Sequence, residues 1–117
     1  MNAEYQKCIE SCMACISACH QCASACLEES PEQFAICIRQ NMKCGTICFA
    51  TIQMITLGSE QVDELCTICA EICNACAAEC ASHHTEMTLL CARSCLKCAD
   101  ACHKLHSAQG LKFWMLN

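Results

Sequence analysis

Cysteine is the residue type with the most chemical potential in this chain, because it supplies 18 of the 117 residues. The cysteines fall into four groups, and within three of them the steps alternate between three and four residues. The groups are Cys8, Cys12, Cys15, Cys19, Cys22 and Cys26; Cys37, Cys44 and Cys48; Cys66, Cys69, Cys73, Cys76 and Cys80; Cys91, Cys95, Cys98 and Cys102. Thiolates at such short spacings are typical ligands of soft metal ions.

The spacing also indicates how the cysteines are held. An average step of 3.5 residues is the repeat of a helix packed in a bundle, so each group predicts one stripe on one helix face. Ser30-Pro31 and Gly58-Ser59 are helix-end signals. We expect helices over about 3–28, 32–57, 60–82 and 85–107 of a single domain spanning 1–117. Short connections favour an all-α, antiparallel up-down-up-down four-helix bundle with a cysteine-lined core.

The second stripe is incomplete. Its first step is seven residues long, and Asn41 stands where the repeat predicts a cysteine. No further cysteine follows Cys48 before the expected helix end. The metal capacity near Asn41 is therefore expected to differ from that of the other stripes.

The composition excludes several classes of protein. A net charge of −5 with seven basic residues argues against a nucleic-acid partner. No apolar run is long enough to span a membrane. The start of the chain has no leader pattern, so we expect a cytosolic protein with reduced thiols. The sequence lacks a paired-carboxylate site, a nucleophile with its own histidine and a glycine-rich phosphate loop, so we expect no enzyme.

Charge decides which metal fits a core of thiols. Many thiolates facing one another require compensating cations. When each Cu(I) is held by two thiolates and each thiolate bridges two ions, the filled core is neutral, whereas each Zn(Cys)4 site carries a charge of about −2. The ferredoxin motif is absent. The sequence favours Cu(I), on the order of 15–20 ions per chain. The alternatives are an iron–sulfur or thiol redox protein, or a zinc buffer.

These stripes resemble those of the bacterial four-helix-bundle copper storage proteins, in their cytosolic branch. The resemblance rests on CMACISACHQCASAC (12–26), CTICAEICNACAAEC (66–80) and CARSCLKCADAC (91–102). It implies that the stripe cysteines bind Cu(I) and that the protein stores copper for copper enzymes or sequesters it against toxicity. It also implies a homotetramer, with copper donor or acceptor proteins or small ligands as further partners.

The ends of the bundle suggest where copper is first captured. Extending the fourth stripe backward from Cys91 reaches Met87 and then His84, with His83 close by. Thioether and imidazole groups suit transient Cu(I) binding, so we hypothesise that His84 and Met87 form a mouth. The opposite end is expected to be closed by an apolar plug, formed by Ile52, Ile55, Val62, Leu65 and Leu105.

The remaining histidines and the tail receive weaker expectations. His106 lies at the edge of the fourth stripe and could cap a metal cluster, whereas His20 and His103 point away from their stripes and are expected at the surface. The segment 107–117 is rich in apolar residues and is expected to dock on this subunit or another. Its large apolar residues are Leu111, Phe113, Trp114, Met115 and Leu116.

Overall fold

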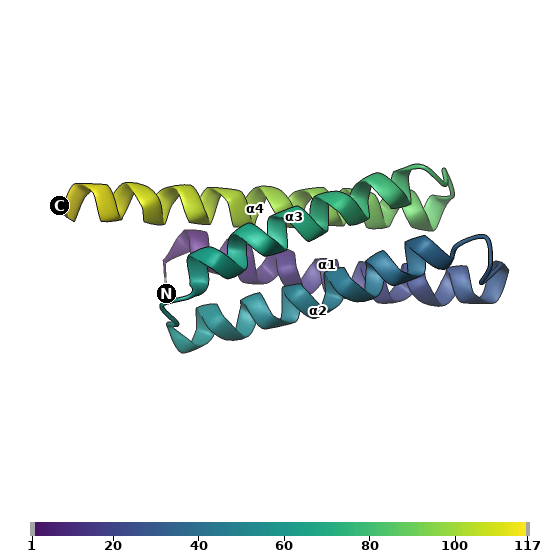
Figure 1. Cartoon of the computed structure of the whole chain (residues 1–117), viewed down its shortest axis with the longest axis horizontal. Coiled ribbons are helices and arrows are strands. Elements are labelled where there is room, and N and C mark those ends of the chain that lie inside the picture. The colour runs from purple at the N-terminus through teal and green to yellow at the C-terminus, as the bar shows by residue number, and fades with distance from the viewer. Residues whose placement is uncertain (1, 117) are drawn as a thin grey trace.

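Four antiparallel helices make up the computed structural model, which describes the backbone of residues 2–116 and the side chains of residues 2–105. The helices are α1 (Ala3–Glu29), α2 (Ala35–Leu57), α3 (Val62–Ala81) and α4 (Glu86–Leu116). They lie side by side in an elongated bundle of 53 × 22 × 19 Å (Figure 1). No strand occurs in the described part of the chain. The predicted all-α bundle is therefore confirmed.

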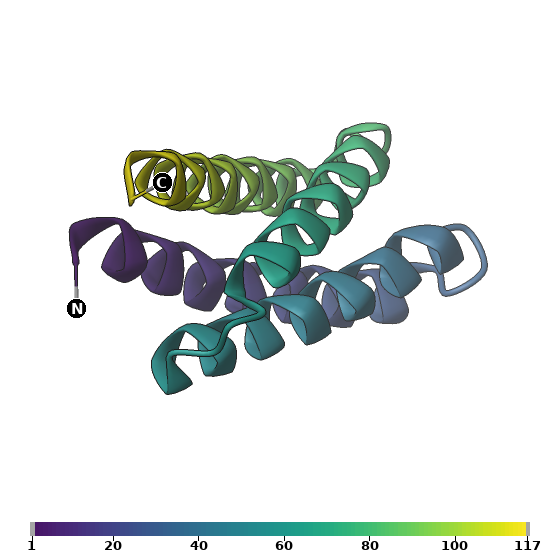
Figure 2. The same ribbon diagram turned by 60° about the vertical axis from the view of Figure 1, so that its left-hand side comes forward.

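Each helix packs against the two helices that flank it. The contacts join α1 to α2 and α4, and α3 to α2 and α4, which is the cyclic order of an up-down-up-down bundle. Figure 2 shows the hairpin of α1 and α2 beside the hairpin of α3 and α4. No helix in the described residues is long and apolar enough to cross a membrane.

Local signals in the sequence set the ends of the first two helices. The Asn2 side chain accepts a hydrogen bond from the backbone N–H of Tyr5 at 2.8 Å, which caps α1. The hydroxyl oxygen of Ser30 accepts a hydrogen bond from the backbone N–H of Gln33 at 3.4 Å. This bond caps a single turn that precedes α2. This turn spans 31–34, and α2 itself begins later than the sequence predicts, at Ala35.

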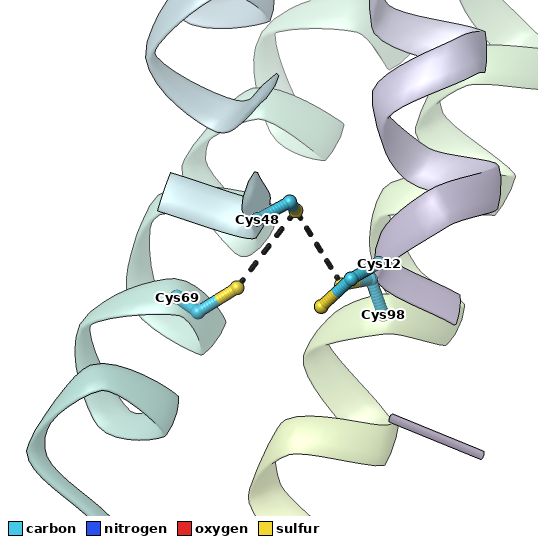
Figure 3. A group of neighbouring side chains, drawn as sticks. All are labelled: Cys12, Cys48, Cys69 and Cys98. Carbon is cyan, nitrogen blue, oxygen red and sulfur yellow. Dashed lines mark hydrogen bonds between the residues drawn. The ribbon is translucent and has the colours of Figure 1, made fainter. Parts of the chain in front are cut away.

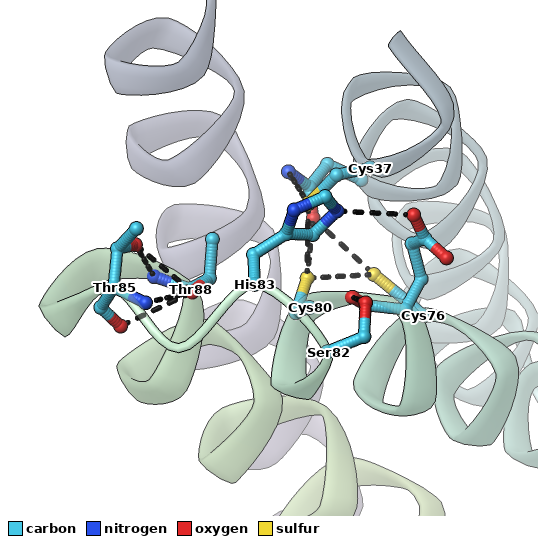
Figure 4. A network of polar contacts seen from close by, with 9 residues as sticks. Cys37, Cys76, Cys80, Ser82, His83, Thr85 and Thr88 are labelled. Carbon is cyan, nitrogen blue, oxygen red and sulfur yellow. Dashed lines mark hydrogen bonds and ion pairs between the residues drawn. The ribbon is translucent and has the colours of Figure 1, made fainter. Parts of the chain in front are cut away.

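The two later connections also use side-chain and backbone caps. Gly58 adopts a left-handed conformation, with φ of 68°, and ends α2 as predicted. Thr85 and Thr88 cap α4 reciprocally, because the N–H of each donates to the hydroxyl oxygen of the other, at 3.0 and 3.1 Å (Figure 4). The helix then runs to Leu116 instead of ending near 107, since no proline interrupts it and Gly110 does not break it.

Small side chains allow the four helices to approach closely. The small residues buried beside the stripes include Ala77, Ala92 and Ala99. The larger buried apolar side chains lie at the two ends of the bundle instead. Phe34 is 2% exposed at one end, and Leu105 is 1% exposed at the other. The middle of the core is therefore built almost entirely of sulfur.

Candidate metal centre

The four cysteine stripes meet along the axis of the bundle. All 18 cysteines are buried free thiols, and every one except Cys26, at 3%, has a relative exposure of 0%. They are positioned by rigid helix interiors, because each stripe occupies the inward face of one helix. The predicted cysteine-lined core is confirmed.

Sulfur atoms from neighbouring helices are in contact along the whole core. Their Sγ–Sγ separations match those of S–H···S hydrogen bonds. The cross-helix pairs include Cys37 and Cys80 at 3.4 Å, Cys44 and Cys73 at 3.4 Å, Cys12 and Cys98 at 3.5 Å, Cys15 and Cys44 at 3.5 Å, and Cys8 and Cys102 at 3.6 Å. Thiols so close together need only small shifts to share a metal ion.

One group of four thiols shows the geometry (Figure 3). Cys48 of α2 lies 3.8 Å from Cys69 of α3 and 3.7 Å from Cys98 of α4, while Cys12 of α1 completes the group. All four Sγ atoms lie within 4.8 Å of one another. Metal–sulfur bonds of about 2.3 Å place two sulfurs about 3.8 Å apart at a tetrahedral ion and about 4.6 Å apart at a linear one. The group can therefore hold a soft ion.

Successive groups share their thiols. The group around Cys48 and Cys98 continues into a second one that contains both of these residues, and later groups are joined through Cys15, Cys19 and Cys95. The four-sulfur groups include Cys12, Cys48, Cys69 and Cys98; Cys15, Cys48, Cys73 and Cys98; Cys15, Cys19, Cys44 and Cys95; Cys19, Cys76, Cys91 and Cys95. The core is thus a continuous series of overlapping sites.

Asn41 interrupts the sulfur lining of α2. Its side chain is fully buried, and its Oδ1 accepts hydrogen bonds from the thiols of Cys76 at 3.2 Å, Cys91 at 3.3 Å and Cys80 at 3.4 Å. Its Nδ2 donates to Cys37 Sγ at 3.9 Å. The amide therefore occupies the cysteine-type position that the repeat predicts and is surrounded by thiols from α2, α3 and α4.

Hydrogen bonding and burial spread the pKa values of the thiols. Burial, aided by the charge of Cys22, raises the pKa of Cys26 from 9.0 to about 12. Cys37 donates a hydrogen bond to Cys22, which raises the pKa of Cys37 to about 11. The bonds that Cys22 receives from Cys37 and Cys80 lower its own pKa to about 7. Without metal, the thiols of Cys26 and Cys37 are therefore protonated at neutral pH.

The end of the core near Cys37 is covered by two connections. The ring of Phe34, before α2, contacts the ring of His83, after α3, with centroids 4.8 Å apart. His83 Nε2 lies 3.1 Å from Glu79 Oε1 (Figure 4). Thr88 is also fully buried here. These three residues cover the end at which the sequence places the mouth.

The two residues assigned to that mouth differ in exposure. His84 is exposed in the turn before α4, with φ of 57°, whereas Met87 is half-buried in the seam between α1 and α4. His83 is the histidine that the structure brings to the end of the core. His20 and His103 are exposed, and the side chain of His106 lies outside the described residues.

Sequence reasoning missed two residues that close this end. Phe34 stands three residues before Cys37, and Thr88 stands three residues before Cys91. Both positions continue the three-and-four repeat, which could have found them. At the opposite end, the expected plug residues Ile55, Val62 and Leu105 are buried, while Ile52 and Leu65 are partly exposed.

Comparison with known proteins agrees with this thiol-lined core. The sequence profile of the family described as copper storage protein matches residues 1–107. The chain belongs to the copper storage protein family. The resemblance stated from the three sequence motifs is confirmed.

One curated relative and two solved structures of copper storage proteins are similar to the chain along most of its length. An uncharacterised cysteine-rich protein of Bacillus subtilis, YhjQ, is 37% identical over 79 residues, which are 67% of this chain and 73% of that protein. The Cu(I)-bound copper storage protein BsCsp3 has a TM-score of 0.83 and 36% identity, and the match covers 86% of this chain and 96% of that one. A cytosolic copper storage protein from Streptomyces lividans, loaded with copper, has a TM-score of 0.85 and 34% identity, covering 89% and 92%.

Proposed function

We propose that this chain stores and buffers Cu(I), and that its ligands are the stripe cysteines. The single observation that carries the proposal is the sharing of thiols between successive groups, as between the two groups that both contain Cys48 and Cys98. A thiolate that belongs to two groups bridges two ions, and bridging thiolates are how Cu(I) reaches one ion per sulfur. Isolated tetrahedral zinc sites would each require four thiolates of their own.

Loading exchanges protons for copper. Each Cu(I) that binds displaces thiol protons to the solvent, so a neutral thiol core becomes a neutral copper–thiolate core. The protein has no need of compensating basic residues inside the bundle, and the described core contains none. This balance supports a capacity on the order of 15–20 Cu(I) per chain.

The family supports a storage role rather than catalysis. We infer that the protein works in the cytosol, where its thiols stay reduced, as the Streptomyces lividans protein is described as cytosolic. We also infer a homotetramer that exchanges copper with donor or acceptor proteins or small ligands. Large exposed apolar side chains on α2 support an assembly; they are Ile36, Met42 and Phe49. Light scattering of the purified protein tests the tetramer.

An anaerobic titration tests the storage function. Reduced protein is titrated with Cu(I) in competition with a coloured Cu(I) chelator. We expect the protein to withhold copper from the chelator until about one ion per cysteine is bound. Binding that stops after a few ions would contradict storage. An equal preference for Zn(II) in a parallel competition would favour the zinc buffer, and colour in the freshly purified protein would favour an iron–sulfur protein.

A further inference from the structure

Three thiols of the core converge on the side chain of Asn41. Its Oδ1 accepts hydrogen bonds from Cys76 at 3.2 Å, Cys91 at 3.3 Å and Cys80 at 3.4 Å, and all four side chains are fully buried. An amide oxygen has two lone pairs, so these three donors exceed the lone pairs that can receive them. A single metal ion between the oxygen and the three sulfurs would bind all four atoms at once.

The distances between these atoms fit a tetrahedral ion held by three sulfurs and one oxygen. Bonds of about 2.3 Å to sulfur and about 2.1 Å to oxygen separate sulfur from oxygen by about 3.6 Å and sulfur from sulfur by about 3.8 Å. The oxygen–sulfur distances here are a few tenths of an ångström shorter. The sulfurs of Cys76 and Cys80 lie 3.9 Å apart (Figure 4), and those of Cys76 and Cys91 lie within 4.8 Å of each other. Small shifts of these side chains would therefore admit an ion.

The donor atoms of this group differ from those of the four-sulfur groups. The four-sulfur groups offer only soft ligands, which suit Cu(I). An amide oxygen is a harder ligand, which Cu(I) does not favour. Zn(II) accepts oxygen beside sulfur and prefers four ligands in a tetrahedron. We call the group the amide site; it consists of Asn41, Cys76, Cys80 and Cys91, and its donor set suits Zn(II).

Charge also favours zinc at the amide site over zinc elsewhere in the core. A zinc ion held by four thiolates carries a charge of about −2, whereas three thiolates and a neutral amide leave a charge of about −1. The buried residues in the described part of the chain include no basic side chain that could compensate either charge. Because the cost of burying a charge rises with its size, a divalent ion is buried at lower cost in the amide site than in a four-sulfur group.

We propose that the amide site binds one Zn(II) in the copper-free protein. Binding breaks three S–H bonds, forms three bonds from zinc to sulfur and one from zinc to Asn41 Oδ1, and releases three protons to water. Neither zinc nor sulfur is oxidised or reduced. The adjoining four-sulfur group shares Cys76 and Cys91 with the amide site, so zinc and copper draw on the same two thiolates. The proposal adds a second metal to the protein and does not depend on how many Cu(I) ions the core stores.

X-ray absorption at the zinc edge tests the donor set. The reduced, copper-free protein is loaded anaerobically with one equivalent of Zn(II), and the atoms bonded to zinc are counted. We expect three sulfurs at about 2.3 Å and one oxygen at about 2.1 Å. Four sulfurs around zinc would overturn the proposal, as would a protein that fails to retain one equivalent of zinc.

Three variants test whether the oxygen bound to zinc is that of Asn41. Asn41→Leu keeps the branched shape and removes the oxygen, so the first Zn(II) should bind at least about tenfold more weakly in competition with a coloured zinc chelator. Asn41→Asp restores an oxygen ligand and should bind zinc at least as tightly as the parent protein. The control Thr51→Val removes another buried polar group of α2, whose hydroxyl donates to the backbone carbonyl oxygen of Ile47 at 2.8 Å. It should bind zinc as the parent does.

The outcomes separate the zinc site from the storage of copper. Zinc binding of parental strength in Asn41→Leu would overturn the proposal, and so would equal weakening in the Thr51→Val control. The same preparation of the parent protein is also titrated with Cu(I). A parent that binds few Cu(I) ions would overturn the storage function, whereas a parent that fills with copper but does not retain zinc would overturn the amide site alone.

Discussion

At Asn41 the repeat predicts a cysteine, but the chain has an amide side chain in the core. It takes a cysteine-type position, yet its Oδ1 accepts hydrogen bonds from three thiols. The broken repeat predicts that the position is unusual. It does not predict the three donors, because these come from α3 and α4 and depend on how the helices pack.

Replacing this amide by a thiol tests whether the number of bound Cu(I) ions rises with the number of core thiols. Asn41→Cys conserves volume and completes the α2 stripe, so we expect the titration endpoint to rise by about one Cu(I) per chain. The control Ala78→Cys adds a thiol at an exposed position of α3 and should leave the endpoint unchanged. An unchanged endpoint in Asn41→Cys would show that copper does not follow the number of core thiols.

The raised pKa values of Cys26 and Cys37 give copper binding a pH dependence. At about 12 and 11, they lie well above neutrality, so both thiols hold protons that copper must displace. As the pH falls, protons compete better, and the affinity falls by about tenfold per pH unit for each proton displaced. Chelator competition at two pH values measures this change in Cu(I) affinity, after correction for the chelator's own protonation. An affinity independent of pH would contradict proton displacement.

At the scale of the helices, the three-and-four repeat predicts well where each helix lies in the sequence, because the repeat marks the buried face of that helix. The starts of α2 and α3 differ from expectation because a capped turn precedes α2 and the turn after Gly58 extends to Gln61. The assignment of His84 to the mouth stays a prediction. Projecting the fourth stripe onto His84 assumes a continuous helix, but α4 begins at Glu86 and His84 has a positive φ.

The reciprocal cap of α4 makes a measurable contribution to stability. Thr88→Val keeps the shape of a buried side chain but removes the hydroxyl that accepts from the N–H of Thr85. We expect the free energy of unfolding of the reduced, copper-free protein to fall by about 1 kcal/mol, the usual value of a helix cap. Denaturant unfolding measures it. The exposed Thr46→Val in α2 serves as the control and should change it by less than about 0.5 kcal/mol.

At the scale of the whole molecule, the bundle is complete without metal. The helices are capped by their own residues, and buried free thiols fill the core at 3.4–4.0 Å from one another. This distinguishes the protein from zinc fingers, in which metal binding and folding are one event. The sequence could predict a core that folds without metal, because thiols can hold protons, whereas the covers over the two ends required the packed structure.

Removing copper should therefore leave the fold intact. We expect the far-ultraviolet circular dichroism of the reduced, copper-free protein to match that of the loaded protein. Loading should nevertheless raise the melting temperature, because ions that bind only the folded state stabilise it. A copper-free protein with little helical signal would contradict a preformed bundle, provided that reductant is present throughout.

The thiols common to successive groups couple each ion to the next. An ion bound at Cys19 and Cys95 orders two sulfurs that two successive groups share, so its neighbour binds to a site that is already half assembled. Because of this coupling, the next Cu(I) binds preferentially beside one that is already bound. The row of sites therefore fills from neighbour to neighbour instead of at random. At half loading, native mass spectrometry would then find nearly empty and nearly full chains together. A single peak centred on half-filled chains would mean that the groups load independently.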